Sequence, residues 1–385
     1  MICWANHKGG RGLRPGVFLL LGVMGTLGLP VAGWANTVGT AIISPERDLV
    51  VLSREETKAA ASASSALPAS LLSSDAAVEK LRALIELSRE TGSPRPLGLA
   101  VGLLDRLPQE EWTPEVLLMR ATIHQRLHRF DQAEADLAKV IEVQPDNSQA
   151  WLTRYSIALV RNDLEAAVVA CNKLGQHRSG LLAQSCEQEL GSFGEQPLES
   201  FERLHQALAE ASRASAAERD YALVTLAEMA TRLDLPMADA LWQRSLLQNP
   251  DDLYRRGRYA DWLLSEGRDV KAADITRGFN DVDTLAVLHA VALTRLNHPD
   301  RVTLIAELEE RFAEAHWRGE FLHQWEYARF LLDVKDDAAA AFEVASANWE
   351  TQRAQPDRDL LARAANGAGE TVNLDLPMQN GEAPL

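Results

Sequence analysis

Apolar residues recur with helical spacing through most of the chain. From residue 75 to residue 365 they return every three to four positions, which places them along one face of an α-helix. No segment shows the strict alternation of apolar and polar residues that is typical of a half-buried strand. Glycine and proline fall mostly between the helical blocks, as at Pro145 and Pro250. The pattern predicts an all-α domain over residues 75–365.

The two ends of the chain lack this periodicity. Residues 36–74 include an Ala/Ser-rich stretch, and residues 366–385 carry several glycines and prolines. Such compositions are typical of segments without a packed core. We therefore expect a flexible segment over 36–74 and a disordered tail over 366–385.

Alanine recurs at intervals of 34 residues in the helical part. If these alanines take position 20 of a repeated unit, alanine also recurs at position 8, and a proline stands at position 32. Small residues at positions 8 and 20 let two helices approach closely, and the proline ends the second helix. The residues with these structural roles are predicted to be Ala121, Ala133, Pro145, Ala167, Ala238, Ala260, Ala272, Ala306, Ala328 and Ala340.

This pattern resembles the tetratricopeptide repeat (TPR), a helix–turn–helix unit of 34 residues. The resemblance implies a right-handed superhelical solenoid with an extended concave face. Segment 182–215 fits poorly, because Phe201 stands where alanine is expected. The stretches 92–98 and 348–353 also resemble those of a group of exported bacterial TPR proteins of unassigned function. The clearest units are 114–147, 148–181, 219–252, 253–286 and 321–354.

In the TPR family, positions 2, 5, 9, 12 and 13 of a unit often face the groove that binds a protein segment. Here the resemblance implies a mixed, partly apolar lining, which favours a peptide or helix with apolar anchors. This lining lacks the set of Lys, Asn and Arg side chains with which some members of the family bind the carboxyl terminus of a partner peptide. The alternative is that these side chains only make surface contacts and contacts between repeats. The implied binding residues are Glu115, Leu118, Thr122, Gln125, Arg126, Gln149, Leu152, Ser156, Leu159 and Val160.

The amino-terminal segment, residues 1–35, has three parts. Lys8, Arg11 and Arg14 precede an apolar run that ends at Pro30, and small residues follow it. This order is typical of a secretory signal peptide. The run has about 14 residues, fewer than the roughly 20 that a helix needs to cross a bilayer. We expect export to the periplasm or beyond the cell without membrane insertion, with an uncleaved membrane anchor as the alternative.

Beyond this segment the chain contains two cysteines, Cys171 and Cys186. Export would take them to an oxidising compartment, which favours a disulfide. The bridge would close a loop of about 15 residues and stabilise the fold by about 3 kcal/mol. The alternative is two buried free thiols, because cysteine is often buried.

Charge and motif content restrict the chemistry. The 385 residues include 39 Lys plus Arg and 55 Asp plus Glu, a formal net charge of −16, which argues against a nucleic-acid partner. His124 and His128 share a helix face, but Gln125 replaces the glutamate of the zinc-protease motif and no third ligand is recognisable. We find no phosphate-binding loop and no catalytic triad. No metal, cofactor or catalytic residue is predicted.

The sequence therefore predicts a non-catalytic scaffold that binds a protein or peptide partner on its concave face. One alternative is a structural subunit of a cell-envelope complex. A further alternative is an enzyme with its site in the irregular segment 182–215.

Overall fold

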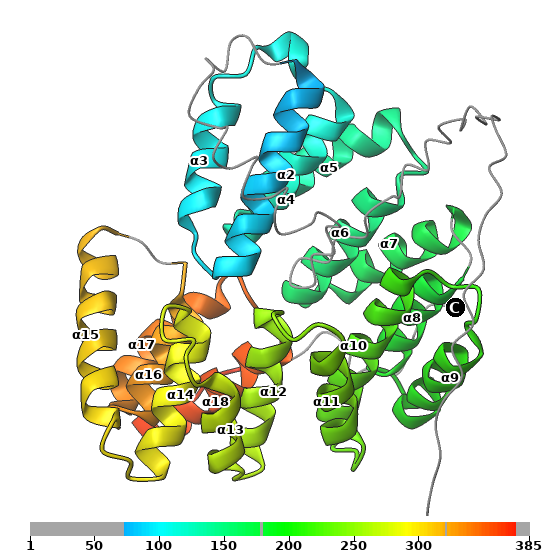
Figure 1. Cartoon of the computed structure of the whole chain (residues 1–385). Helices are drawn as coiled ribbons and strands as arrows, with labels where there is room; N and C mark the ends of the chain where they lie inside the picture. The colour runs from blue at the N-terminus through cyan, green and yellow to red at the C-terminus, as the bar shows by residue number, and fades with distance from the viewer. Residues whose placement is uncertain (1–72, 178–179, 320–321, 375–385) are drawn as a thin grey trace, which may run out of the picture. The chain divides into compact units, whose positions relative to one another are not determined.

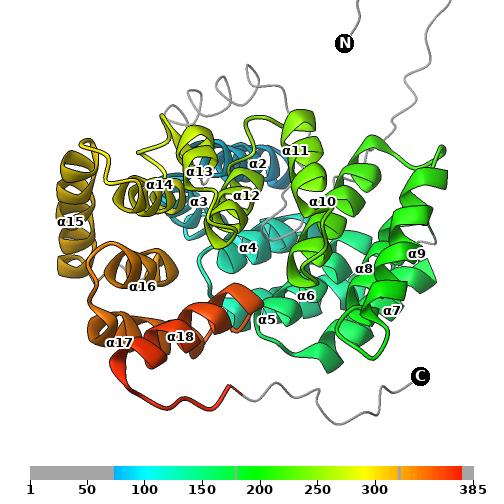
Figure 2. The same ribbon diagram turned by 90° about the horizontal axis from the view of Figure 1, so that it is seen from below.

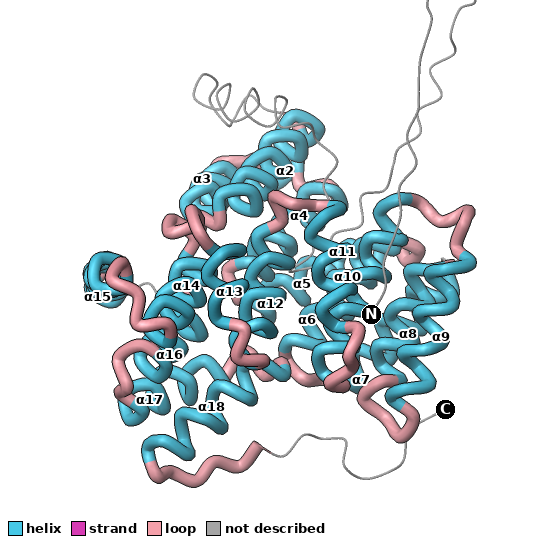
Figure 3. Tube along the Cα trace, turned by 60° about the horizontal axis from the view of Figure 1, so that its bottom comes forward, coloured by secondary structure: helices cyan, strands magenta, loops and turns pink. Residues whose placement is uncertain are grey.

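The computed structural model describes residues 73–177, 180–319 and 322–374, which all lie in one compact unit, Thr40–Leu385 (Figures 1 and 3). These residues form helices and loops, with no strand among them. None of the described helices is long and apolar enough to cross a bilayer. The α-helices are α2 (Ser74–Thr91), α3 (Arg95–Leu104), α4 (Pro114–Arg126), α5 (Phe130–Val143), α6 (Ser148–Val160), α7 (Leu164–His177), α8 (Leu181–Gly191), α9 (Pro197–Glu210), α10 (Ala216–Arg232), α11 (Ala238–Gln248), α12 (Leu253–Ser265), α13 (Asp269–Thr276), α14 (Asp283–Arg295), α15 (Arg301–Trp317), α16 (Gln324–Asp333), α17 (Ala338–Trp349) and α18 (Gln355–Ala368).

Consecutive helices pack as pairs. We call the even-numbered helices from α2 to α16 the inner helices, and the odd-numbered helices from α3 to α17 the outer helices. Each inner helix packs on the outer helix that follows it, and α18 packs on α17 at the carboxyl end of the array. The predicted fold class, an all-α helical-repeat solenoid, is confirmed.

Local sequence signals set the helix ends. Thr113, Asn147 and Asp252 each accept a hydrogen bond from a backbone N–H in the first turn of α4, α6 and α12. After most inner helices, one residue takes a positive φ, which reverses the chain into the outer helix. The residues that do so are Gly92, His128, Asn162, Asp234, Gly267, Asn297 and Asp336.

Small side chains hold the pairs together. Seven of the nine alanines at the predicted contact positions have no exposed surface, so the two helices of a pair meet closely there. Pro145 follows the end of α5 at Val143. The fully buried predicted alanines are Ala121, Ala133, Ala167, Ala238, Ala260, Ala272 and Ala328.

The prediction is wrong for Ala306, which is exposed, and Ala340 is only partly buried. The cause at Ala306 is the short helix α13, which has 8 residues. It shortens its pair, so α14 begins at Asp283, and Ala290 is the eighth and fully buried residue of this inner helix. In the last pair the neighbouring Ala341 is the fully buried alanine.

Two predicted boundaries also change. Segment 182–215 contains an ordinary helix pair, α8 and α9, in which Phe201 is 2% exposed and replaces the expected alanine with a large apolar contact. Helix α18 extends to Ala368, three residues into the predicted tail, and ends where Gly369 takes a φ of 73°. The predicted signal peptide, nearly all of the predicted flexible segment and the tail from residue 375 lie outside the described residues.

Distant parts of the array touch one another. Arg89 on α2 lies 3.6 Å from Asp252, the N-cap of α12, although 163 positions separate the two residues. At the carboxyl end, the backbone N–H of Arg353 donates to the carbonyl of Val160, the last residue of α6 (2.7 Å). Figure 2 shows α18, which begins just after Arg353, beside α17. The helices of this unit therefore close around a central space.

Candidate functional site

A cavity of about 1450 Å³ lies among the inner helices. Every inner helix and α18 contribute residues to its wall. Most small-molecule sites have volumes of about 300–1,000 Å³. This cavity is therefore large enough for a segment of a polypeptide chain.

The turns after the inner helices face the cavity. His128, Asn162, Asp234 and Gly267, which all have positive φ, line it together with Gly92. The carboxyl ends of α2, α4, α6, α10 and α12 therefore meet at this site.

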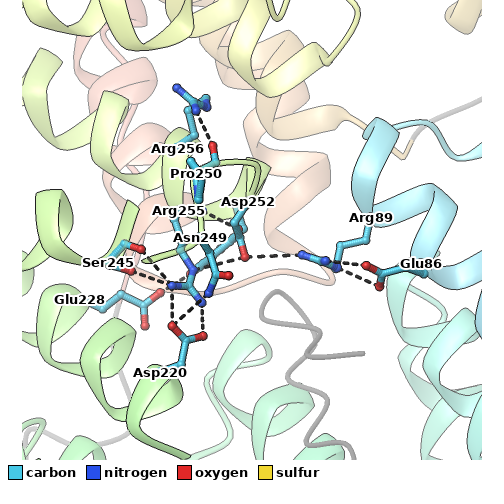
Figure 4. A network of polar contacts seen from close by, with 11 residues as sticks. Glu86, Arg89, Asp220, Glu228, Ser245, Asn249, Pro250, Asp252, Arg255 and Arg256 are labelled. Atoms are coloured by element: carbon cyan, nitrogen blue, oxygen red, sulfur yellow. Dashed lines mark hydrogen bonds and ion pairs between the residues drawn. The ribbon is translucent and has the colours of Figure 1, made fainter. Parts of the chain in front are cut away.

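A buried polar network supports one side of the cavity (Figure 4). Arg255, 2% exposed, donates from Nη1 to Asp220 Oδ1 (2.8 Å) and to the carbonyl and Oγ of Ser245 (both 3.1 Å). Its Nε lies 3.2 Å from Asp252, which Arg89 approaches from α2. The network thus joins α10, α11 and α12 to the first helix pair.

Gly92, in the turn after α2, lies against residues from the α12 and α14 region. A Cβ atom at Gly92 would lie 2.8 Å from Val282 Cγ1 and 3.3 Å from Leu253 Cδ1, and the φ of Gly92 is +66°. Only a residue without a side chain fits this position.

Substituting Gly92 therefore tests the closure. Gly92→Ala is expected to lower the free energy of unfolding by about 1–2 kcal/mol more than Gly267→Ala does, because of the added clash. Gly267 is a matched control, because it has the same φ of +66° and a Cβ atom added to it would meet no atom within 4 Å. Urea denaturation of both variants measures the difference, and equal losses would contradict the contact.

A second polar network lies where α12, α16 and α18 meet. Arg329 is 6% exposed and donates from Nη1 to Asp261 on α12 (2.7 Å). It also pairs with Asp333, which pairs in turn with Arg363 of α18. Burial acts to lower the pKa of Arg329, but the two carboxylates outweigh it and raise that pKa. These side chains are charged and already paired with one another.

A third group joins the turn after α4 to α16. Burial lowers the pKa of His128 to about 4, although Glu326 acts in the opposite direction. Burial raises the pKa of Glu326, but His323 and a hydrogen bond from Thr284 (2.5 Å) outweigh it and bring that pKa to about 2. At neutral pH this wall therefore holds a neutral histidine and an ionised glutamate.

The cavity wall is polar and nearly balanced in charge. Among the described residues, nine arginines and ten carboxylates line it, although the whole chain has a net charge of −16. Between the charges lie aromatic side chains, including Tyr254, Trp262 and Trp325. The wall thus offers apolar anchoring surface together with charges of both signs.

The structure divides the residues implied by the TPR resemblance into two groups. Gln125, Arg126, Ser156, Leu159 and Val160 line the cavity. All five belong to the second half of α4 or α6.

The other five implied residues do not line this cavity. Leu152 and Thr122 are fully buried, and Gln149 is 9% exposed with its amide bonded to Thr153. Leu118 packs into the hydrophobic clusters around α4, and Glu115 accepts a hydrogen bond from Gln144 outside the cavity. Packing and hydrogen bonds within the array occupy these five side chains.

The binding residues implied by the resemblance leave out the wall formed by α12, α16 and α18. The same positions of the unit 253–286 include Tyr254, Gly257 and Asp261, and position 5 of the last unit is Trp325; all four line the cavity. The family position rule would therefore have found them in these units. Nothing in the sequence indicated the contribution of α18.

The remaining sequence candidates lie elsewhere. Cys171 on α7 and Cys186 on α8, the pair predicted to bridge, are joined by a disulfide with a Cα–Cα distance of 5.9 Å, and neither lines the cavity. Within the described residues, no three His, Cys, Asp or Glu side chains are placed to hold a metal ion.

The paired helices and the buried alanines between them define a TPR-like helical-repeat protein. Among solved structures, the chain is similar to the TPR domain of P58(IPK), with 13% sequence identity and a TM-score of 0.21 over 81% of this chain and 92% of that one. No protein-family model matches the chain, and no curated protein matches it.

Proposed function

We propose that this protein is an exported, non-catalytic scaffold that holds a segment of a protein partner in its central cavity. The observation that carries the proposal is the cavity itself, about 1450 Å³ in volume and walled by every inner helix. A site built from all the repeats suits a ligand that extends past several of them.

The wall favours a segment with apolar anchors and charges of both signs. Trp262, Trp325 and Tyr254 provide rigid aromatic surface, the kind of contact that contributes most to binding energy. The adjoining ion pairs, such as Arg329 with Asp261, provide polar groups around these anchors. Because these charged groups already pair with one another, the wall is better suited to binding than to acid–base catalysis.

Export rests on residues 1–35, which have the three parts of a secretory signal peptide. Cell fractionation and mass spectrometry of the purified protein test it. A mature chain that begins near Asn36 in the exported fraction supports the proposal, whereas an intact amino terminus in the membrane fraction supports the anchor.

The proposed binding predicts where the partner will crosslink. A photoreactive phenylalanine analogue at Trp325, in the cavity wall, is expected to crosslink a discrete partner in living cells. The same analogue at Leu247, which is 82% exposed on outer helix α11, is expected to give none. The measurement is gel analysis and mass spectrometry of the crosslinked species.

An analogue at Leu159, also in the cavity wall, controls for a Trp325 variant that fails to fold. Crosslinking from Leu247 but from neither cavity position would contradict the proposal. That result would favour a structural subunit that uses its outer surface.

A further inference from the structure

One side chain in the cavity wall has unused hydrogen-bonding capacity. Gln125, in the last turn of α4, is 2% exposed and lines the cavity. In the described structure, neither its Nε2 nor its Oε1 has a hydrogen-bond partner. Buried polar groups are nearly always paired, so an amide with both halves unpaired requires an explanation.

Other buried amides in this fold do have partners. Gln149, one repeat further along, donates to Thr153 Oγ1 (3.2 Å). Asn348 on α17 donates to Asp357 (2.7 Å) and accepts from Gln352 (2.7 Å). The packing of this protein therefore satisfies buried amides elsewhere, and the exception lies at the cavity.

The geometry of a carboxamide restricts what would satisfy it. Its N–H donor and its carbonyl acceptor lie side by side, so its best partner presents an acceptor and a donor with the same spacing. In an extended polypeptide, the N–H and C=O of one residue point to the same side of the chain, and neighbouring strands exchange both bonds there. The main chain of an extended segment fits this requirement without regard to its sequence.

We propose that Gln125 is the main-chain anchor of the cavity and pairs with the N–H and C=O of one residue in an extended segment of the partner. This inference rests on the proposed function and specifies the conformation of the bound segment. Gln125 lines the cavity, so a segment bound there would lie beside its side chain. Specificity comes from Trp325 and the other aromatic side chains.

The proposal predicts opposite effects on stability and binding. Gln125→Met keeps the shape of the side chain and removes the unpaired amide, so the Tm of the free protein is expected to rise by about 2–4 °C. Gln149→Met is the matched control: it removes a bonded amide, and its Tm is expected to fall. Thermal unfolding followed by circular dichroism measures both.

Binding is tested with a defined probe. Peptides are selected from a random phage-displayed library on the mature protein, and those whose affinity falls with Trp325→Ala are retained. The best peptide is then synthesised with each main-chain nitrogen methylated in turn, which removes one donor at a time. Methylation at one main-chain nitrogen is expected to weaken binding about tenfold, and so is the Gln125→Met substitution. Because both changes remove the same interaction, the methylated peptide should bind the Gln125→Met variant little more weakly than the unmethylated peptide does.

The outcomes separate the inference from the proposed function. If peptides bind in the cavity but Gln125→Met leaves their affinity unchanged, or lowers the Tm as Gln149→Met does, the inference is wrong and the scaffold function stands. If no selected peptide depends on Trp325, the proposed function fails and the inference fails with it.

Discussion

Replacing Arg255 with methionine is expected to lower the free energy of unfolding by about 3–5 kcal/mol. Arg255 is 2% exposed and bonds to Asp220 and Ser245, with Asp252 at 3.2 Å (Figure 4). Removing it leaves the 7% exposed carboxylate of Asp220 buried without its main partner. An uncompensated buried charge costs far more than the loss of a surface ion pair.

Urea denaturation at neutral pH measures this loss. The matched control is Arg277→Met, because the side chains of Arg277 and its partner Asp274 are 72% and 59% exposed. A loss of less than about 1 kcal/mol is expected there. Adding Asp220→Asn to Arg255→Met should restore part of the stability, since it removes the unpaired charge. Equal losses for the two arginine variants would contradict the assigned role of Arg255.

His128 is expected to make the fold less stable in mild acid. Burial lowers its pKa in the folded protein to about 4, from an ordinary value of 6.5. Above pH 6.5 the imidazole is neutral in both the folded and the unfolded state, so stability is complete. Between pH 6.5 and pH 4 the unfolded state binds a proton that the folded state does not, so stability falls. Because the ring keeps some contact with water, we expect a loss of about 2 kcal/mol over this range.

His128→Asn is expected to flatten this pH dependence, because asparagine tolerates the φ of 54° and does not titrate. The measurement is the free energy of unfolding at several pH values from 7 to 4. His298→Asn, on the exposed turn before α15, controls for the loss of any imidazole. An unchanged slope for His128→Asn would contradict the effect of burial on this ring.

The helices and their pairing could be predicted from the sequence, because both depend on short-range patterns. Apolar spacing marks each helix, and alanines such as Ala133 and Ala260 mark where two helices meet. The predicted contact alanine is wrong at Ala306 and is replaced by its neighbour Ala341 in the last pair. The short helix α13 shifts the following helix pair along the sequence. The 34-residue spacing therefore places Ala306 at a position that is exposed rather than packed.

The cavity could be predicted only in part. The position rule treats every inner helix alike, yet Thr122 is fully buried whereas Ser156, at the same position of the next unit, lines the cavity. The rule cannot show this because the tilt of a helix depends on its neighbours. The contacts of Arg89 with Asp252 and of Arg353 with Val160 join residues far apart in the sequence, and no local pattern encodes them.

The contact between the first and sixth pairs also has an evolutionary consequence. Open solenoids change length readily, because gaining or losing a module leaves every other interface intact. Here the loss of one helix pair between α2 and α12 would move Gly92 away from Val282. It would also separate Arg89 from Asp252. The number of modules is thus set by geometry, and homologues should vary in their loops and outward-facing side chains before they vary in module count.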